Sequence, residues 1–263
     1  MFTVTYAQLN AWLTAFLWPF TRILALIAVA PVLSNRALPT RVKIGLAAFT
    51  TLIVAPTIGA MPHVTVFSGE GVWIIANQFL IGAALGFVMQ IVFGIVTTAG
   101  ELMGLGMGLG FASFFDAEAG GTTPATSSIL NMFAMIAFLV FDGHLQMIAA
   151  LVETFQSLPV SANVLAAPGW RMLATFGSVV FSSGLLLALP VVVALLITNL
   201  SLGILNRAAP QIGIFQVGFA VTALAGLLLI LMMVPNLIPF FGRLFDGGIE
   251  EMGRVAAALR PPG

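Results

Sequence analysis

Three long apolar runs constrain this chain more than any other feature of its sequence. They cover residues 72–98, 179–205 and 215–241, and none of them contains an ionisable residue. A bilayer core about 30 Å thick is crossed by roughly 20 apolar residues in a helix, because a helix satisfies every backbone polar group internally. The three runs therefore predict membrane-spanning helices.

Three further runs predict spans with interruptions. Residues 9–33 contain Pro19 and Arg22, residues 44–60 are short, and residues 129–152 are broken near their middle by Asp142, Gly143 and His144. Together with the first three they predict six crossings. The expected fold is an all-α membrane protein of hydrophobic helices and helical hairpins, with residues 1–263 forming one polytopic membrane domain.

Composition excludes several classes of function. Hydrophobic residues make up 60% of the chain and charged residues only 7%, whereas a soluble domain carries about 25% charged residues. Nine basic residues balance nine acidic ones, so no basic surface is expected and nucleic acid is not a predicted partner. With no cysteine, two isolated histidines and no catalytic or nucleotide-binding signature, we expect no enzyme, no metal site and no cofactor.

The distribution of basic residues predicts an orientation. Arg36, Arg41 and Lys43 lie in one short loop, which the positive-inside rule places in the cytoplasm, with the N-terminus outside. The run at 72–98 then returns the chain to the inside, and one more crossing is needed before the next clear span, which begins at Ser128. Residues 99–110 are too short to provide that crossing. We therefore expect the chain to re-enter and turn back at about residues 110–124, where protein or a water-filled cavity must surround it.

A glycine repeat precedes this expected turn. Gly100, Gly104 and Gly108 recur at spacing four, as do Gly82 and Gly86. Small residues at this spacing let membrane helices approach closely. A nucleotide-binding loop is the weaker interpretation, because no strand precedes the glycines and no phosphate-binding lysine follows them.

Aromatic residues follow the glycines directly. Phe111, Phe114 and Phe115, with Asp116 beside them, lie where the re-entrant turn is expected. In a conduit such a cluster forms a hydrophobic constriction that excludes water and ions. Buried phenylalanine is more often simple core packing, and on the residues alone that interpretation is favoured.

Ionisable and amide side chains occur within or beside the apolar runs. Arg22 and Glu101 are costly to place in lipid, and either a proton path or a structural lock explains their presence; the lock is favoured, since a relay needs several acidic or histidine side chains on one face. Asp142 and His144 mark a helix break. Interhelical hydrogen bonds are expected from five amides: Asn77, Gln78, Gln90, Asn131 and Asn199.

Several motifs, in order along nearly the whole chain, resemble the FliR/SctT family of type III secretion export-apparatus proteins. The N-terminal part carries FLWPFTR at residues 16–22, Ala-Pro at 30–31 and PTRVKIGLA at 39–47. The glycine motif follows at residues 100–112, and LNRAAPQ at 205–211, with Phe215 and Gly218 after it, resembles the family's most recognisable motif. Two positions depart from the usual pattern: Gly106, just before the expected turn, and Ala117, within it.

The resemblance implies a subunit of the flagellar export gate in the bacterial inner membrane. Such proteins join FliP and FliQ in a helically arranged channel with FlhB at its entrance and FlhA beneath, and unfolded rod, hook and filament subunits pass through as cargo. It implies a FliP-like portion at about residues 1–200, a FliQ-like hairpin at about 175–245, and a plug carried over to Phe111, Phe114, Phe115 and Asp116. The residues then expected in helix packing and subunit assembly are Arg22, Gly100, Glu101, Gly104, Gly108, Asn206, Arg207 and Pro210.

Two other functions stay open at this point. The injectisome counterparts of the SctT type share the expected architecture and differ in their cargo. An independent small-molecule transporter is suggested by the ionisable residues within the apolar runs, and it would take up solute without partner proteins.

Overall fold

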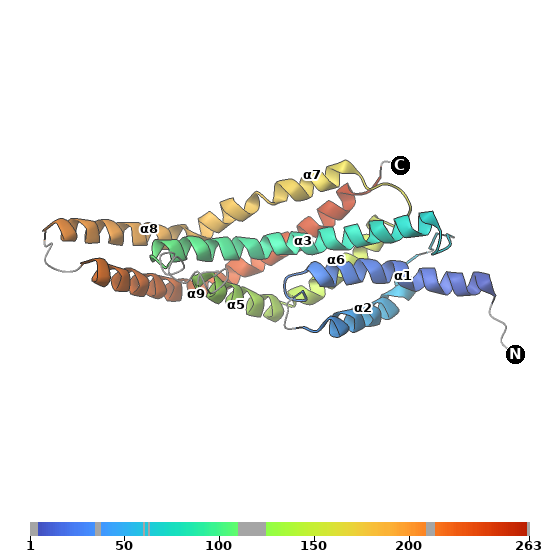
Figure 1. Cartoon of the computed structure of the whole chain (residues 1–263), viewed down its shortest axis with the longest axis horizontal. Helices are drawn as coiled ribbons and strands as arrows, with labels where there is room; N and C mark the ends of the chain where they lie inside the picture. The colour runs from blue at the N-terminus through green and yellow to red at the C-terminus, as the bar shows by residue number, and fades with distance from the viewer. Residues whose placement is uncertain are drawn as a thin grey trace. The chain divides into compact units, whose positions relative to one another are not determined.

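The computed structural model describes residues 5–34, 38–59, 61–62, 64–109, 125–208 and 214–261, and these contain helices and turns but no strand. The elements are shown in Figure 1: α1 (Tyr6–Val29), α2 (Thr40–Val54), a 3-10 turn (Ala55–Thr57), α3 (Gly69–Gly106), α5 (Ala125–Val140), α6 (Gly143–Ser157), α7 (Ala167–Phe176), α8 (Val179–Ala208) and α9 (Ile214–Ala258).

Four segments of the described chain are long and apolar enough to cross a membrane, or five if α5 and α6 are counted as one broken span. They are Gln8–Val29, Gly69–Gly106, Ala167–Ala208 and Gly218–Ala258. The predicted all-α membrane fold is thereby confirmed. The three uninterrupted apolar runs fall within α3, α8 and α9, as expected.

The prediction of six crossings is wrong at α2. This helix has 15 residues, which at 1.5 Å per residue gives about 22 Å, less than the hydrocarbon core of about 30 Å. It ends at Val54, where a 3-10 turn containing Pro56 follows. Hydrophobic composition alone could not reveal this, because apolar residues continue past the end of the helix.

The predicted break near Asp142 is confirmed. α5 ends at Val140 and α6 begins at Gly143, and Asp142 between them has a left-handed backbone with φ 55° and ψ 23°. Aspartate tolerates this conformation better than most side chains, because its short polar group interacts with the local backbone. Asp142 is exposed, in keeping with a turn between two helices.

The chain divides into two compact units. Unit 1 consists of Met1–Ile91, Asp142–Gly177 and Phe245–Gly263, and unit 2 consists of Val92–Phe141 and Ser178–Leu244. α3 and α9 each contribute residues to both units. Each unit therefore has its own core and its own polar contacts.

In unit 1, α1 runs alongside the first part of α3, as Figure 1 shows, and α7 packs against the end of α9. Trp18 and Leu26 of α1 are fully buried. The backbone N–H of Ala166 donates to the carbonyl oxygen of Leu259 at 3.0 Å. A methyl group on Gly169 would lie 2.5 Å from Leu259 Cγ, so the glycine allows this close approach.

Unit 2 is built around the second part of α3. Phe93 of α3 meets Phe138 of α5 edge to face, with ring centroids 5.7 Å apart, and both side chains are buried. α8 and the first part of α9 bury few of their residues by comparison. The outward faces of these two helices carry exposed apolar side chains, among them Leu186, Leu196, Leu200, Leu228 and Leu231.

Candidate functional site

A fully buried arginine joins three segments of unit 1. Arg22 of α1 donates from Nε to Gln78 Oε1 of α3 at 2.8 Å and from Nη1 to Thr154 Oγ1 of α6 at 3.1 Å. Its Nη2 donates to the carbonyl oxygen of Leu158, just after α6, at 3.0 Å. The guanidinium carbon also lies 4.1 Å from the ring centroid of Phe155. All three guanidinium nitrogens are thus occupied by the chain's own acceptors.

The Arg22 cluster is held without a carboxylate partner within the described residues. Burying a charge is costly unless it is hydrogen-bonded, and bonds to a charged donor are stronger than neutral ones. Three acceptors and an aromatic face provide that compensation. The planar fork of arginine matches acceptors on three separate segments, and the contact therefore fixes α6 against α1 and α3.

Two glycines of α3 allow α1 to approach. A methyl group on Gly82 would clash with the carbonyl oxygen of Arg22, and one on Gly86 would lie 2.9 Å from Val29 Cβ. Gln90, one turn further along, donates from Nε2 to the carbonyl oxygen of Val29 at 2.8 Å. Close backbone packing, predicted from the spacing of Gly82 and Gly86, is confirmed, and the partner is α1 of the same chain.

A second close approach lies in unit 2, between α3 and α5. A methyl group on Gly100 would clash with Ser127 Cα and lie 2.8 Å from its backbone nitrogen. The hydroxyl of Thr126 donates to the carbonyl oxygen of Gly100 at 2.8 Å. Asn131 donates from Nδ2 to Thr97 Oγ1 at 2.9 Å. Glycine thus brings α5 within reach of the backbone of α3, and polar side chains bridge the contact.

Gly108 has a different role from the glycines before it. α3 ends at Gly106, and Gly108 has a left-handed backbone with φ 81°. The N–H of Leu109 donates to the carbonyl oxygen of Gly104, and the N–H of Gly108 to that of Leu105, each at 3.0 Å. These two bonds define the Schellman motif, in which glycine terminates a helix. Gly108 therefore does not belong to a helical stripe; it stops α3 just before the predicted plug.

The remaining predicted residues are not brought together by the described structure. Glu101 is half-buried on α3, and its carboxylate makes no hydrogen bond or ion pair with a described residue. Gly104 is buried, and Asn206 and Arg207 are exposed in the last turn of α8. Five predicted residues lie outside the described residues: Phe111, Phe114, Phe115, Asp116 and Pro210.

The prediction of interhelical bonds is confirmed for Gln78, Gln90, Asn131 and Asn199, whereas Asn77 bonds to the loop between α6 and α7. Beyond Gln78, Gln90 and Asn131, Asn77 donates from Nδ2 to the carbonyl oxygen of Asn163 at 2.9 Å, and Asn199 donates from Nδ2 to that of Gly106 at 3.3 Å. The sequence did not predict three residues that contact Arg22, namely Thr154, Phe155 and Leu158. Their positions in the sequence carry no signal, because they lie more than 130 residues from Arg22.

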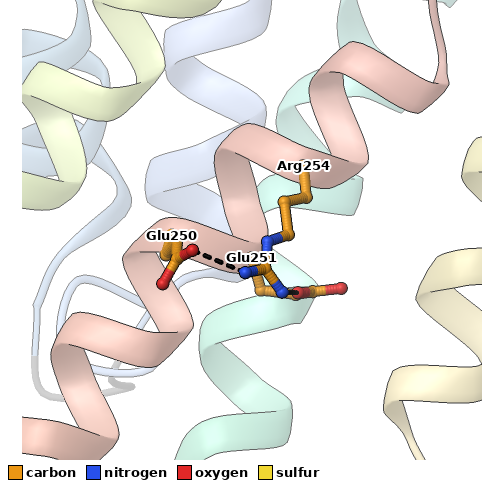
Figure 2. A network of polar contacts seen from close by, with 3 residues as sticks. All are labelled: Glu250, Glu251 and Arg254. Atoms are coloured by element: carbon orange, nitrogen blue, oxygen red, sulfur yellow. Dashed lines mark hydrogen bonds and ion pairs between the residues drawn. The ribbon is translucent and has the colours of Figure 1, made fainter.

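The charged surface of α9 differs in character from the Arg22 cluster. Figure 2 shows Arg254 between Glu250 and Glu251, with Nη2 2.6 Å from Glu250 Oε1 and Nη1 3.5 Å from Glu251 Oε2. Arg254 and Glu250 are exposed, so water competes for both groups. Within the described residues, no group of three or more metal-ligating side chains gathers here or elsewhere.

We expect the substitution Arg254→Gln to change the free energy of unfolding by less than about 1 kcal/mol, because exposed ion pairs on a helix contribute little. Unfolding of the full-length chain in mixed micelles measures this. The same measurement at high salt provides the control. Salt screens an exposed ion pair and should narrow the difference in unfolding free energy between the wild type and Arg254→Gln. A loss of several kcal/mol would contradict the expectation and show that water does not weaken this ion pair.

Comparison with known proteins identifies the family. The family model described as bacterial export proteins, family 1, matches residues 13–248. Flagellar biosynthetic protein FliR of Pectobacterium carotovorum is 45% identical over 259 residues, covering 98% of this chain and 99% of the relative. FliR of Escherichia coli is 45% identical over 246 residues, 94% of each chain, and FliR of Bacillus subtilis is 26% identical over 250 residues, 93% of this chain and 95% of the relative. Together with its long apolar helices, these matches show that the chain belongs to family 1 of the bacterial export proteins, as a multi-pass membrane component of the flagellar type III export apparatus.

Proposed function

We propose that the chain joins FliP and FliQ in forming the channel of the flagellar export gate, through which unfolded rod, hook and filament subunits leave the cell. The observation that carries the proposal is the 45% identity to FliR proteins over nearly the full length of both chains. The exposed apolar faces of α8 and α9 support it, because they require lipid or neighbouring subunits to cover them. FlhB at the channel entrance and FlhA beneath complete the proposed assembly.

The chain acts in this proposal as a conduit and not as a catalyst, and it needs no cofactor. A FliP-like portion extends over about residues 1–200 and a FliQ-like hairpin over about 175–245. α8 and the first part of α9 lie side by side within unit 2 and support the hairpin assignment: a methyl group on Gly218, near the start of α9, would lie 3.7 Å from Leu202 Cδ1, near the end of α8.

The plug is proposed to consist of Phe111, Phe114, Phe115 and Asp116. The Schellman motif at Gly108 supports this, because it makes the chain leave the axis of α3 three residues before Phe111. α5 begins at Ala125, and its second and third residues, Thr126 and Ser127, contact Gly100 of α3. The helices before and after the proposed plug therefore lie side by side.

Replacing Phe114 and Phe115 together by glycine is expected to make the resting gate leaky to small ions, because the constriction loses two of its three phenylalanine side chains. Conductance of reconstituted complexes in planar bilayers measures the leak. The double substitution Phe67→Gly and Phe181→Gly, at exposed positions in the turn before α3 and on α8, is the matched control. Unchanged resting conductance of a normally assembled complex would overturn the plug assignment.

The experiment that tests the proposed function is affinity purification of the tagged full-length chain from its own membranes, followed by native mass spectrometry. Recovery with FliP and FliQ is the expected result, and a lone chain or a homodimer would instead favour the transporter. Substitution Glu101→Ala is expected to reduce recovery of both partners, because a half-buried carboxylate that has no partner among the described residues is suited to bind a neighbour. Glu70→Ala in the first turn of the same helix is the control.

A further inference from the structure

An open groove of about 480 Å³ lies between α8 and α9, within unit 2. Leu186 and Pro190 of α8 form one wall, and Leu229, Met232 and Phe240 of α9 form the other. Among the described residues, Asn236 and Arg243 are the only ones with polar side chains that line it. The groove is thus mainly apolar, with one amide near its middle and a cation at one end.

The guanidinium group of Arg243 makes one hydrogen bond to a described residue. Its Nε donates to the carbonyl oxygen of Pro239 on its own helix at 3.4 Å, a long hydrogen bond, and the side chain is exposed. Asp246, the acidic residue one turn further along α9, makes no ion pair with it, and neither does any other described carboxylate. The two terminal nitrogens of the guanidinium are therefore free, within the described part of the chain, to bind an anion at the end of the groove.

The position of Arg243 along α9 corresponds to a membrane interface. It is the first ionisable residue of a helix that begins at Ile214. From Leu229 to Arg243 the groove follows 14 residues of helix, or about 21 Å at 1.5 Å per residue. Half of a bilayer about 40–45 Å thick, headgroups included, has the same length. The groove therefore matches one leaflet, with the arginine at headgroup depth.

We infer that this groove binds one anionic phospholipid, with an acyl chain lying along α8 and α9 and the phosphate at Arg243. A helix from a neighbouring protein is the competing occupant, but it would need an acidic side chain at the level of Arg243, whereas every anionic phospholipid carries its phosphate at headgroup depth.

The test uses the export complex reconstituted in vesicles of phosphatidylethanolamine and phosphatidylglycerol. Two photoactivatable probes with the same diazirine acyl chain are added in turn, one a phosphatidylglycerol and the other a phosphatidylcholine. We expect the anionic probe to label peptides covering residues 186–191 and 229–243. Arg243→Gln should reduce this labelling about fivefold, as expected for one basic residue at an anionic surface, and leave the phosphatidylcholine labelling unchanged. Arg171→Gln, an exposed arginine on α7, should change neither.

A second pair of variants tests the groove itself. Met232 lines the groove and Leu231, its neighbour, does not, and both side chains are well exposed. Met232→Trp should fill the groove and remove labelling by both probes, whereas Leu231→Trp should not. Equal labelling by both probes that is insensitive to Arg243→Gln would overturn the inference, as would capture of a partner protein by a photo-crosslinking amino acid at position 232. Recovery of FliP and FliQ with the variants shows separately whether the proposed function stands.

Discussion

Replacing Arg22 by methionine is expected to lower the free energy of unfolding by at least about 3 kcal/mol, because hydrogen bonds to charged donors contribute about 1.5–3 kcal/mol each. The substitution leaves Gln78 Oε1 and the Leu158 carbonyl oxygen buried without the donor that now satisfies them. Thr154 keeps the bond that its own hydroxyl donates within α6 but loses the one it accepts. Denaturant unfolding of the full-length chain in mixed micelles measures the loss.

Three controls separate the hydrogen-bond network from charge and from general sensitivity to mutation. Arg22→Lys should fall between the wild type and methionine, since a compact ammonium cannot reach three acceptors arranged for a planar fork. Arg22→Met combined with Gln78→Leu should recover part of the loss, because it removes one of the unsatisfied acceptors. Arg171→Gln, at an exposed position, should change stability by no more than about 0.5 kcal/mol. Wild-type stability of Arg22→Met would show that the network contributes nothing.

The sequence predicts much of the fold because lipid restricts what a long apolar run can form. The runs at 72–98, 179–205 and 215–241 need internal backbone hydrogen bonds, and they are helical in the structure. The same reasoning misjudged residues 44–60, because hydrophobicity does not report where a helix stops. The turn at Ala55–Thr57 depends on Pro56 and on the local backbone, and it leaves α2 too short to span.

Sequence identified Arg22 as unusual but could not supply its surroundings. The three acceptors come from positions 56, 132 and 136 residues away, and such distances appear only after the helices have packed. Gly108 shows another limit. Glycine favours close packing and also left-handed helix termination, and a spacing of four is compatible with both. Only the backbone angles and the two terminal hydrogen bonds separate these roles.

Adding one methyl group at three glycines of this chain is expected to have effects of opposite sign. Gly82→Ala would bring a methyl group against the carbonyl oxygen of Arg22 and within 2.9 Å of Ala25 Cβ. Gly100→Ala would press on the backbone of Ser127 and disturb the hydrogen bond from Thr126 to the Gly100 carbonyl. Overpacking of this kind costs about 1–3 kcal/mol, and backbone atoms cannot rotate away as a side chain can.

Gly203→Ala is the matched control, because nothing lies within 4 Å of the added methyl group in α8. There alanine should be neutral or stabilising by up to about 1 kcal/mol, from its higher helix propensity. Unfolding of the three variants under one condition measures all of these effects. If only Gly82→Ala and Gly100→Ala lose stability, the loss comes from contact between helices, because the gain in helix propensity from glycine to alanine is the same at every position. Equal effects at all three positions would mean that α3 does not approach α1 and α5 as closely as described, and the Arg22 cluster would lose the close packing that buries it.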